Sequence, residues 1–459
     1  MAEFLSPAPP RSTRAVLCLL LTVMTMSCQP RSPEAADERA TLADELALSL
    51  KEQVLEVWYP LAVDTVHGGF LSDFSYRWEP DGPQHKMIVT QARHVWTTAK
   101  ALEFYAGHET YAEAAAHGFA FLRDVMWDEE FGGFFTLVSR EGVVQGGEDR
   151  FMKTAYGNAF GIYALAAYTH ATGDAAALQL AQKAFGWLEA YSHDPVHRGY
   201  FQFLERDGTP LQEGYLDTPP KDQNSSIHLL EAFTELYQVW PDALLRERLS
   251  EMLLLIRDTI TTDTGYLTLF FEQDWTPVSY RQADAAEREA HYHLDHVSFG
   301  HDVETAFLML EASEALGLHD DTTTLQIGKK MVDHALRHGW DDTVGGLYDA
   351  GYYFEGDSAL TLIDDTKVWW AQAETLNTLL LMADRFPDDE QRYFDKFKRL
   401  WAYTKTYLID AEHGGWYWGG LDKEPARKTG PKAEIWKGNY HTARSLMNGV
   451  QRLRGNPTP

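Results

Sequence analysis

The chain has 459 residues, and 68 acidic residues against 40 basic ones give it a formal net charge of −28. Such an acidic surface repels nucleic-acid phosphates, so we expect no nucleic-acid partner. Aromatic residues make up 13% and hydrophobic residues 44% of the chain, which excludes a disordered protein and provides for a large core. The two cysteines, Cys18 and Cys28, lie near the N-terminus. We therefore expect no disulfide and no cysteine-bound metal in the rest of the fold.

The N-terminus resembles an export signal. Residues 15–26 form an apolar run after two arginines, with the length of a signal-peptide core but too short for a lasting membrane span. Cys28 follows, as in bacterial lipoprotein signals, where the cysteine is lipidated. We predict a signal peptide over 1–27, a membrane tether through lipidated Cys28, and an exported protein in the periplasm or anchored as a lipoprotein. Thr25 stands where such signals usually carry Leu, so ordinary secretory cleavage and an apolar N-terminus without targeting role remain alternatives.

The rest of the chain is organised by internal repeats. Residues 28–40 are polar and are predicted to form a linker, followed by a single domain over 41–455 without Gly/Ser-rich or Pro-rich breaks. A short motif recurs six times: an acidic residue, a short spacer, one or two glycines, and then an aromatic or aliphatic residue. Its second glycine, or its single glycine where there is one, is Gly69, Gly133, Gly199, Gly265, Gly346 and Gly415 in turn. Most copies are 64–69 residues apart, and one interval of 81 residues carries an insertion.

Two stretches with apolar residues at i, i+3, i+4 spacing accompany each repeat, and this pattern predicts paired amphipathic helices. The first, less charged set follows strand-like runs and covers 91–107, 155–172, 223–239, 300–317, 367–384 and 437–453. The second, more charged set covers 42–60, 111–127, 176–192, 242–260, 322–338 and 390–408. Six pairs indicate an all-α fold, an (α/α)6 barrel of six inner and six outer helices with short β-hairpin connections. An open solenoid of helix pairs is the structural alternative.

The predicted inner helices begin with side chains that are unusual at buried positions. They are Arg93, Tyr156, Asn158, Asn224, His228, His301, Glu304, Trp369, Trp370, Glu374, Trp436 and His441. Each alone has a structural explanation, such as a core tryptophan, a hydrogen-bonded histidine or a salt-bridge glutamate. Their shared position in the repeat places them on one rim of the barrel, and polar groups are costly to bury there without a purpose. We therefore predict a functional site at this rim.

The residue types indicate carbohydrate chemistry. Tryptophan faces suit the C–H faces of sugar rings, and Asn, Glu and Arg address hydroxyls. Histidine both accepts and donates a proton near neutral pH, so two histidines on opposite faces of one carbon could invert its configuration. Arg93 could stabilise the enediolate oxygen that forms when a proton leaves the carbon beside a carbonyl.

Several motifs, in their order on the repeat, carry a family resemblance. They are QAR at 91–93, Asn-x-x-x-His at 224–228, SFGHDVE at 298–304, WWAQAE at 369–374 and WKGNYH at 436–441. At these residues the chain resembles the N-acylglucosamine 2-epimerase superfamily, and within it the cellobiose 2-epimerases, over about 42–453. The resemblance implies an (α/α)6 barrel without metal or nucleotide cofactor. It also implies epimerisation at C2 of the reducing-end aldose of a β-1,4-linked disaccharide, such as cellobiose or lactose, through a cis-enediol.

The resemblance further assigns roles to the predicted site. By motif, His301 and His441 would be the opposed acid/base pair that acts after ring opening, and Glu304 would orient and tune His301. Arg93 and His228 would bind the O1/O2 edge of the intermediate. Contacts to hydroxyls would come from Tyr156, Asn224 and Glu374. Trp369 or Trp370, together with Trp436, would stack on the sugar.

Two features depart from the family pattern. Ser226 stands where the cellobiose enzymes often carry a further histidine. The insertion over 275–296 ends in HYHLDH, whose histidines at 291, 293 and 296 could bind a metal, although a substrate-covering loop or a surface hairpin is favoured.

Other functions stay open at this stage. An aldose–ketose isomerase shares the enediol, and N-acyl sugars or monosaccharides are alternative substrates. A glycoside hydrolase would use Glu304 and Glu374 as its two carboxyls, and a non-catalytic sugar-binding lipoprotein is a further alternative. We expect a small-molecule oligosaccharide as the ligand, and a monomer or weak dimer.

Overall fold

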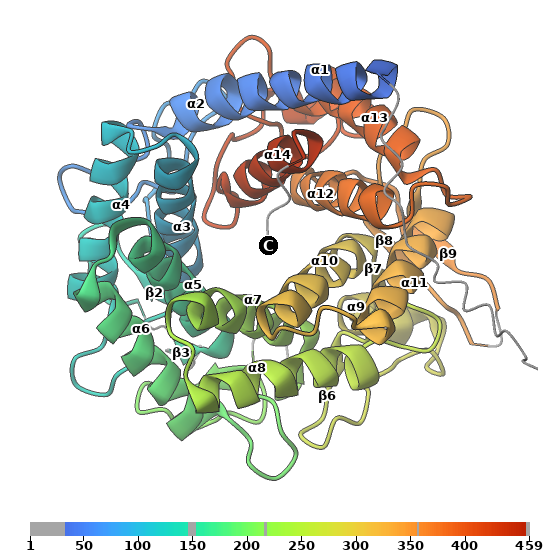
Figure 1. Cartoon of the computed structure of the whole chain (residues 1–459). Coiled ribbons are helices and arrows are strands. Elements are labelled where there is room, and N and C mark those ends of the chain that lie inside the picture. Colours follow the sequence, from blue (N-terminus) through green and yellow to red (C-terminus); the bar gives the residue numbers. More distant parts are fainter. Residues whose placement is uncertain (1–32, 146–152, 215–217, 356–357, 456–459) are drawn as a thin grey trace, which may run out of the picture.

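In the computed structural model, residues 33–145, 153–214, 218–355 and 358–455 are described; the predicted signal peptide and Cys28 lie outside them. Two concentric rings of helices form the molecule (Figure 1). The inner ring consists of α3 (Ile88–Phe104), α5 (Ala155–Thr172), α7 (Gln223–Val239), α10 (Phe299–Ala315), α12 (Trp369–Arg385) and α14 (Tyr440–Leu453). The outer ring consists of α1 (Pro33–Ser49) with α2 (Glu56–Trp58), α4 (Glu109–Phe121), α6 (Ala175–Trp187), α8 (Ala243–Leu255), α11 (Thr322–Gly339) and α13 (Tyr393–Tyr403).

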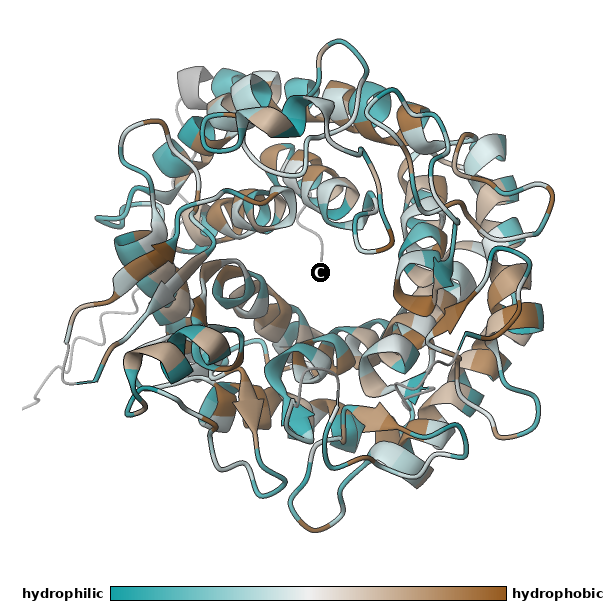
Figure 2. Cartoon of the chain, turned by 180° about the vertical axis from the view of Figure 1, so that it is seen from behind, coloured by the Kyte–Doolittle hydropathy of each residue, from teal (hydrophilic) through white to brown (hydrophobic). Residues whose placement is uncertain are grey.

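The inner ring is closed. Each inner helix packs against the next along the chain, and α14 packs against α3. This closure confirms the predicted (α/α)6 barrel and excludes the open solenoid. Inner helices such as α5 are buried along almost their whole length, which explains why they carry fewer charges than the outer helices. The loops that leave the rings are largely hydrophilic (Figure 2).

The outer helices differ from the prediction at their ends. Helix α1 begins at Pro33, so the stretch over 33–40 that was expected as linker is helical. Five outer helices close with a π-helical turn, namely Leu50–Leu55, Leu122–Met126, Leu188–Ser192, Ile256–Ile260 and Thr404–Leu408. Such wider turns add residues to a helix end without a break. None of the helices in the described part of the chain is both long and apolar enough to cross a membrane.

Short antiparallel strands join successive repeats at one end of the barrel. The two-stranded pairs are β1 (Lys86–Met87) with β2 (Leu137–Val138), β3 (Lys153–Thr154) with β4 (Phe203–Leu204), and β5 (Lys221–Asp222) with β6 (Phe270–Phe271). A three-stranded sheet contains β7 (Val297–Ser298), β8 (Ala350–Tyr352) and β9 (Thr361–Asp364). Because an inner helix begins directly after β1, β3, β5 and β7, these pairings align the helix starts at one rim. Two helices separate the partners of each two-stranded pair, so these pairs are not hairpins. The predicted hairpins lie directly after β2, β4 and β6, where antiparallel bridges join Val138 to Val144, Leu204 to Pro210 and Phe271 to Pro277.

The glycine turns are structural. Gly69 adopts the left-handed conformation, and a Cβ there would lie 2.5 Å from Gln91 Oε1, which accepts a hydrogen bond from the next residue of the turn. Asn158 holds Phe134 in the same way, so this predicted polar residue serves the fold. The fourth turn is one residue shorter, since Thr261 pairs with Leu267. The predicted alignment of Gly265 with the other second glycines is therefore wrong by one position.

Buried ion pairs anchor five of the six turns. The pairs are Asp64–Lys86, Asp128–Lys153, Asp194–Lys221, Asp341–Lys367 and Asp410–Lys432, with N to O distances of 2.6–3.0 Å. In the fourth repeat, Thr262 stands at the position of the acid and Val297 at that of the strand lysine. Since an unpaired buried charge is costly, these two neutral replacements compensate each other.

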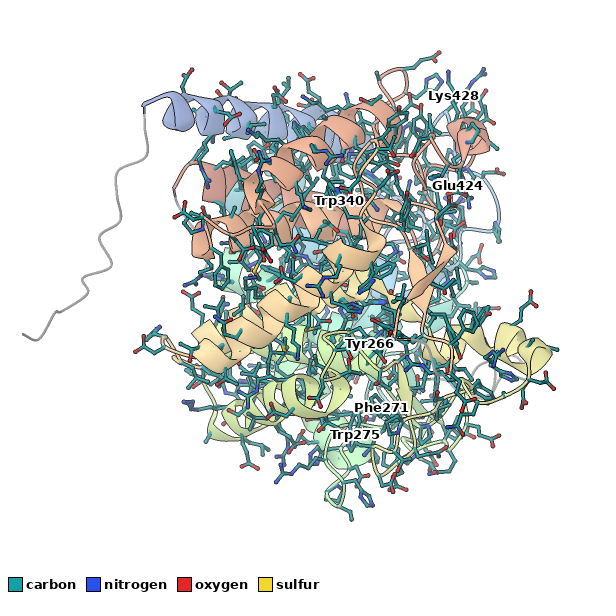
Figure 3. All side chains as sticks on the ribbon, turned by 90° about the vertical axis from the view of Figure 1, so that its right-hand side faces the viewer. Tyr266, Phe271, Trp275, Trp340, Glu424 and Lys428 are labelled. Carbon is teal, nitrogen blue, oxygen red and sulfur yellow. The ribbon has the colours of Figure 1, made fainter. Side chains whose placement is uncertain are left out.

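The insertion forms a helix rather than the expected loop or hairpin. Helix α9 (Ala285–Asp295) is capped by Asp284, whose side chain accepts from two backbone N–H groups. It projects from the barrel at the end that also carries Glu424 and Lys428 (Figure 3). His291 and His296 each direct Nδ1 to a backbone carbonyl one turn earlier, which is a structural role and does not gather the three histidines around an ion.

Candidate functional site

A cavity of about 430 Å³ opens at the rim where the inner helices begin. Its walls contain every residue to which the resemblance assigns a role except Glu374, namely Arg93, Tyr156, Asn224, His228, His301, Glu304, Trp369, Trp370, Trp436 and His441. The helices α3, α5, α7, α10, α12 and α14 or the segments just before them supply these side chains. The structure thus places these side chains together at one rim of the barrel.

Three histidines in the cavity are held in the same way. Their Nδ1 atoms make the following contacts: His228 with Glu231 Oε2 at 2.8 Å, His301 with Ser298 Oγ at 2.9 Å, and His441 with Glu374 Oε1 at 2.7 Å. No Nε2 atom of the three has a hydrogen-bond partner within the described residues. Each Nε2 is thus the ring nitrogen that is left for a ligand.

The partners of these Nδ1 atoms differ in kind. A carboxylate only accepts, so Glu231 and Glu374 hold the proton on Nδ1 of His228 and His441, whose Nε2 then presents a lone pair. A serine hydroxyl both donates and accepts, so Ser298 allows His301 to carry its proton on either nitrogen. The arrangement offers a base on one helix and a group able to act as acid or base on another.

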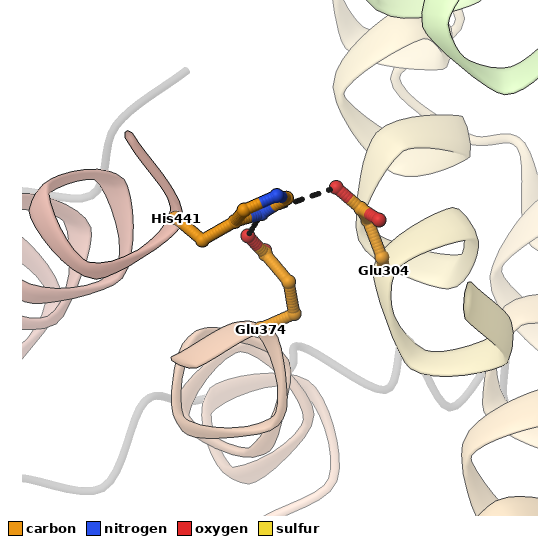
Figure 4. Close-up of side chains that lie close together, drawn as sticks. All are labelled: Glu304, Glu374 and His441. Carbon is orange, nitrogen blue, oxygen red and sulfur yellow. Dashed lines mark hydrogen bonds and ion pairs between the residues drawn. The ribbon is translucent and has the colours of Figure 1, made fainter. Parts of the chain in front are cut away.

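The guanidinium of Arg444 joins the carboxylates beneath the cavity. Its Nη2 donates to Glu304 Oε1 at 2.6 Å and to Glu374 Oε1 at 2.7 Å, and its Nη1 donates to Glu231 Oε1. Figure 4 shows Glu304 and Glu374 approaching His441 from two helices. The Arg444 side chain is only 2% exposed, so these interactions act where water screens them little.

Burial and charge oppose each other in this network. Burial raises the pKa of Glu374, and Arg444 opposes that rise. Burial favours a higher pKa for Glu231 as well, but the charges of Arg444 and His228 outweigh burial and lower the pKa of Glu231 to about 2. Burial lowers the pKa of His301 to about 3 and, together with Arg93, lowers that of His441 well below its ordinary value. Both histidines are therefore neutral near pH 7 in the free protein.

Two assigned roles do not fit the geometry. Glu304 was expected to orient His301, but Ser298 forms the hydrogen bond that holds His301. Oε1 of Glu304 instead accepts from Arg444 and lies 3.8 Å from Nδ1 of His441. Glu374 was expected to contact sugar hydroxyls, but it is fully buried and lies behind His441. Both carboxylates position other side chains.

The same carboxylates could suggest a metal site. Ligand atoms of Glu304, Glu374 and His441 lie within 4.8 Å of one another. Arg444 binds Oε1 of both glutamates, however, and supplies the positive charge at the position an ion would take. We assign the cluster to holding Arg444 and His441.

The aromatic residues divide into two groups. Trp370 lies beside both His301 and His441, with its ring centre 4.8 Å from that of His301 and 5.7 Å from that of His441. Trp369 is buried and packs on Trp418 at 4.4 Å. Trp370 and the half-exposed Trp436 are therefore the better-placed platforms for a ring.

Arg93 is prepared for a ligand at the other wall. Its Nη2 donates to Tyr156 Oη at 3.2 Å, and its guanidinium lies over the rings of Phe160 and Tyr440 at 4.5 and 5.2 Å. Its Nε is buried and has no hydrogen-bond partner within the described part of the chain. The aromatic rings fix the plane of the guanidinium while leaving donors for a ligand.

Some site residues were missed from the sequence. Ser298, Asp349 and Trp418 also line the cavity, as does His296, which had been considered only as a metal ligand. Glu231 and Arg444 each stand three positions after a site histidine, at i,i+3 spacing on the same helix face, and this spacing could have revealed them. Ser226, which departs from the family pattern, hydrogen bonds the carbonyl of Asp222 within α7 and does not line the cavity.

Comparison with known proteins identifies the family. The sequence profile of N-acylglucosamine 2-epimerase (GlcNAc 2-epimerase) matches residues 69–445. The chain belongs to this family. It is an isomerase, a carbohydrate epimerase. Cellobiose 2-epimerase of Bacteroides fragilis is 30% identical to this chain over 413 residues, covering 88% of this chain and 98% of the relative. Cellobiose 2-epimerase of Ruminococcus albus is 30% identical over 422 residues, covering 90% and 99%.

Solved structures of two cellobiose 2-epimerases share the barrel. That of cellobiose 2-epimerase from Spirochaeta thermophila has a TM-score of 0.76 and 31% identity, covering 91% of this chain and 98% of the other. That of cellobiose 2-epimerase from Bacillus thermoamylovorans has a TM-score of 0.78 and 25% identity, covering 90% and 99%. The resemblance found in the sequence motifs is thus confirmed.

Proposed function

We propose that this protein epimerises C2 of the reducing-end aldose of a β-1,4-linked disaccharide. It would convert cellobiose to glucosyl-mannose and also lactose to epilactose, through a cis-enediol. The observation that carries the proposal is the arrangement of His301 and His441, which come from different inner helices, line one cavity and both contact Trp370. The likeness to the cellobiose 2-epimerases of B. fragilis and R. albus supports the disaccharide substrate.

The reaction follows from the proton positions. After the pyranose ring opens, the C1 carbonyl acidifies the proton on C2. His441 Nε2 takes that proton, because Glu374 holds the ring with its lone pair toward the cavity. The C2–H electron pair forms the C1–C2 double bond, the π pair of the C1 carbonyl moves onto O1, and Arg93 stabilises the resulting enediolate.

The second step returns a proton from the other side. His301 takes up a proton from solvent in the complex with the sugar and so enters this step as an imidazolium. It delivers its Nε2 proton to the opposite face of C2, the electron pair of the C1–C2 double bond forms the new C2–H bond, and the electron pair on O1 restores the aldehyde. The negative charge of the intermediate raises the proton affinity of His301 and so offsets the effect of burial. After one turnover, His441 carries the extra proton and His301 is neutral. In the reverse reaction His301 is therefore the base and His441 the acid.

An aldose–ketose isomerase is the second candidate. D-Mannose isomerase of Thermobifida fusca is 26% identical over 348 residues, covering 72% of this chain and 78% of the relative. The two reactions share the enediol and differ in whether the proton returns to C2 or to C1.

A glycoside hydrolase is disfavoured. Such an enzyme needs two carboxyls roughly 5–10 Å apart that flank the scissile bond. Glu304 and Glu374 instead bind the same nitrogen of Arg444, and Glu374 does not reach the cavity.

Incubation with cellobiose in deuterated water tests the proposal. We expect deuterium at C2 of glucosyl-mannose, and no glucosyl-mannose from His301→Ala or His441→Ala. His413→Asn, in the sixth glycine turn outside the cavity, is the matched control and should exchange as the unchanged protein does. A fructose-ended product alone would establish the isomerase, and release of free glucose would establish a hydrolase.

We also propose that the protein is exported and tethered through lipidated Cys28. The support is the apolar run over 15–26 that ends just before this cysteine. Metabolic labelling with a fatty acid should mark the full chain but not Cys28→Ala, and equal labelling of both would refute the tether.

A further inference from the structure

A fourth histidine lines the catalytic cavity. His296 follows helix α9, which the insertion forms, and directly precedes strand β7. Ser298 stands two residues further along, and it lines the cavity as well. Side chains alternate along extended backbone, so His296 and Ser298 point to the same face of β7. Since Ser298 holds His301, His296 belongs to the part of the cavity wall next to His301.

The backbone fixes one nitrogen of the His296 ring. Nδ1 lies 2.8 Å from the carbonyl oxygen of Tyr292. A carbonyl oxygen only accepts, so Nδ1 carries the proton and Nε2 carries the lone pair. Nε2 has no hydrogen-bond partner within the described residues and remains accessible. The ring therefore offers the cavity one fixed acceptor.

The surroundings of His296 suit an acceptor better than a base. Burial lowers the pKa of His296 below its ordinary value. Its Nδ1 faces a neutral carbonyl, whereas Nδ1 of His228 and of His441 faces a carboxylate, which stabilises a protonated ring. A neutral His296 binds a donor through Nε2 and does not take its proton.

The same wall carries a second acceptor. Asp349 lines the cavity and directly precedes β8, the strand that pairs with β7. Burial raises the pKa of Asp349 to about 6, so near pH 7 its carboxyl is mostly ionised and accepts only. The donors of Arg93 lie at the other wall. A sugar between the two walls is therefore expected to accept hydrogen bonds from Arg93 and to donate hydroxyl protons toward His296 and Asp349.

We propose that His296 is a specificity-determining residue whose Nε2 accepts a hydrogen bond from the hydroxyl on C3 or C6 of the reducing-end sugar. The choice of these hydroxyls rests on the proposed function. In a closed β-1,4-linked sugar O4 is in the glycosidic bond and O5 in the ring, and Arg93 and His228 are assigned to O1 and O2. The insertion over 275–296 thus supplies a substrate contact through its last residue.

Two replacements separate the two nitrogens of His296. His296→Asn keeps an N–H near the position of Nδ1, where it can donate to Tyr292, but removes the acceptor at Nε2. His296→Gln places an amide oxygen near the position of Nε2. In steady-state epimerisation of cellobiose, His296→Asn should raise KM about fivefold, the worth of one neutral hydrogen bond, and keep kcat within about threefold. His296→Gln should keep KM and kcat within about twofold of the unchanged protein.

Cellobioses that lack the hydroxyl on C3 or on C6 of the reducing-end glucose identify the contact. For one of the two, His296→Asn and the unchanged protein should have the same KM, because the hydroxyl that donates to Nε2 is already absent. His291→Asn is the matched control. His291 makes the same contact on the same helix, with Nδ1 2.8 Å from the carbonyl oxygen of Glu287, but does not line the cavity. It should leave KM and kcat unchanged.

Three results would overturn the inference. The first is full activity of His296→Asn with loss in His296→Gln, which would leave only the bond to Tyr292. The second is an equal penalty of His296→Asn on cellobiose and on both deoxy sugars. The third is a fall in kcat of about 10³-fold in both variants, which is typical of an acid/base group.

Binding of cellobiitol separates this inference from the proposed function. This alditol has no carbonyl and cannot react, so calorimetry reports binding alone. Weaker binding to His296→Asn but not to His296→Gln, without any epimerisation of cellobiose, would uphold the contact and refute the proposed function. Absence of binding to the unchanged protein would overturn both.

Discussion

Replacing Arg444 by methionine removes the one cation that contacts three buried carboxylates. Glu231, Glu304 and Glu374 each lose a charge-assisted hydrogen bond and remain buried. Breaking a buried ion pair by removing one partner costs about 3–5 kcal/mol. Some of the carboxylates will bind protons instead, which limits the loss, and we expect about 4 kcal/mol less free energy of unfolding near pH 7.

Activity should fall through the histidines. Glu231 holds His228, and Glu374 holds His441. Arg444 fixes the positions of both glutamates through its hydrogen bonds to them. A shift of the acid/base group by about 1 Å costs roughly 10²-fold in rate, so kcat should fall by at least about that factor. Arg444→Lys restores the charge but not the planar fork that reaches three carboxylates, so it should recover stability more than kcat.

Urea unfolding and steady-state epimerisation measure the two effects. Arg452→Met is the matched control, because Arg452 is also buried on α14 but forms no ion pair within the part of the chain that the structure describes. It should keep kcat. If Arg444→Met keeps kcat within about threefold and loses less than about 1 kcal/mol, Arg444 does not organise the site.

Further predictions concern the hydrogen bonds, pH dependence and ion pairs. Glu374→Leu should lower kcat by about 10²–10⁴-fold with little change in KM, since His441 Nδ1 then loses the acceptor that fixes its tautomer; unchanged kcat would contradict this role. Ser298→Ala should lower kcat by about tenfold, the worth of one hydrogen bond, and Ser298→Thr should restore it; equal loss in both would point to packing. Burial lowers the pKa of His94 to about 3, so the unfolded chain binds more protons between about pH 6.5 and pH 3 and stability falls as the pH falls through that window. His94→Phe should flatten the decline in unfolding free energy between pH 6.5 and 4.5 by roughly 2 kcal/mol, and an unchanged slope in urea titrations would refute it. Asp194→Thr with Lys221→Val, which copies the fourth repeat, should cost less than the sum of the single changes; strict additivity in a double-mutant cycle would argue against compensation.

The sequence by itself determined the architecture and most of the site. Periodic apolar positions and six glycine turns were enough to predict the barrel, because each repeat must bury its less charged helix against its neighbours. The predicted bounds of α5 and α7 agree with the structure, since both are flanked by residues that stop or cap a helix. Side chains at equivalent positions of the repeats must lie at the same rim of the barrel. All the residues to which the resemblance assigns a role, except Glu374, line one cavity there.

Only the tertiary structure decided which groups act on one another. Periodicity places a side chain on a helix face but does not say which partner on another helix it meets, so Glu304 was paired with His301 on its own helix, whereas it contacts Arg444 and His441 from α14. The burial of Glu374 and the choice of Trp370 over Trp369 beside the histidines depend on distances across the ring. Those distances arise from the closure of six helices around one axis, which no local pattern in the chain contains.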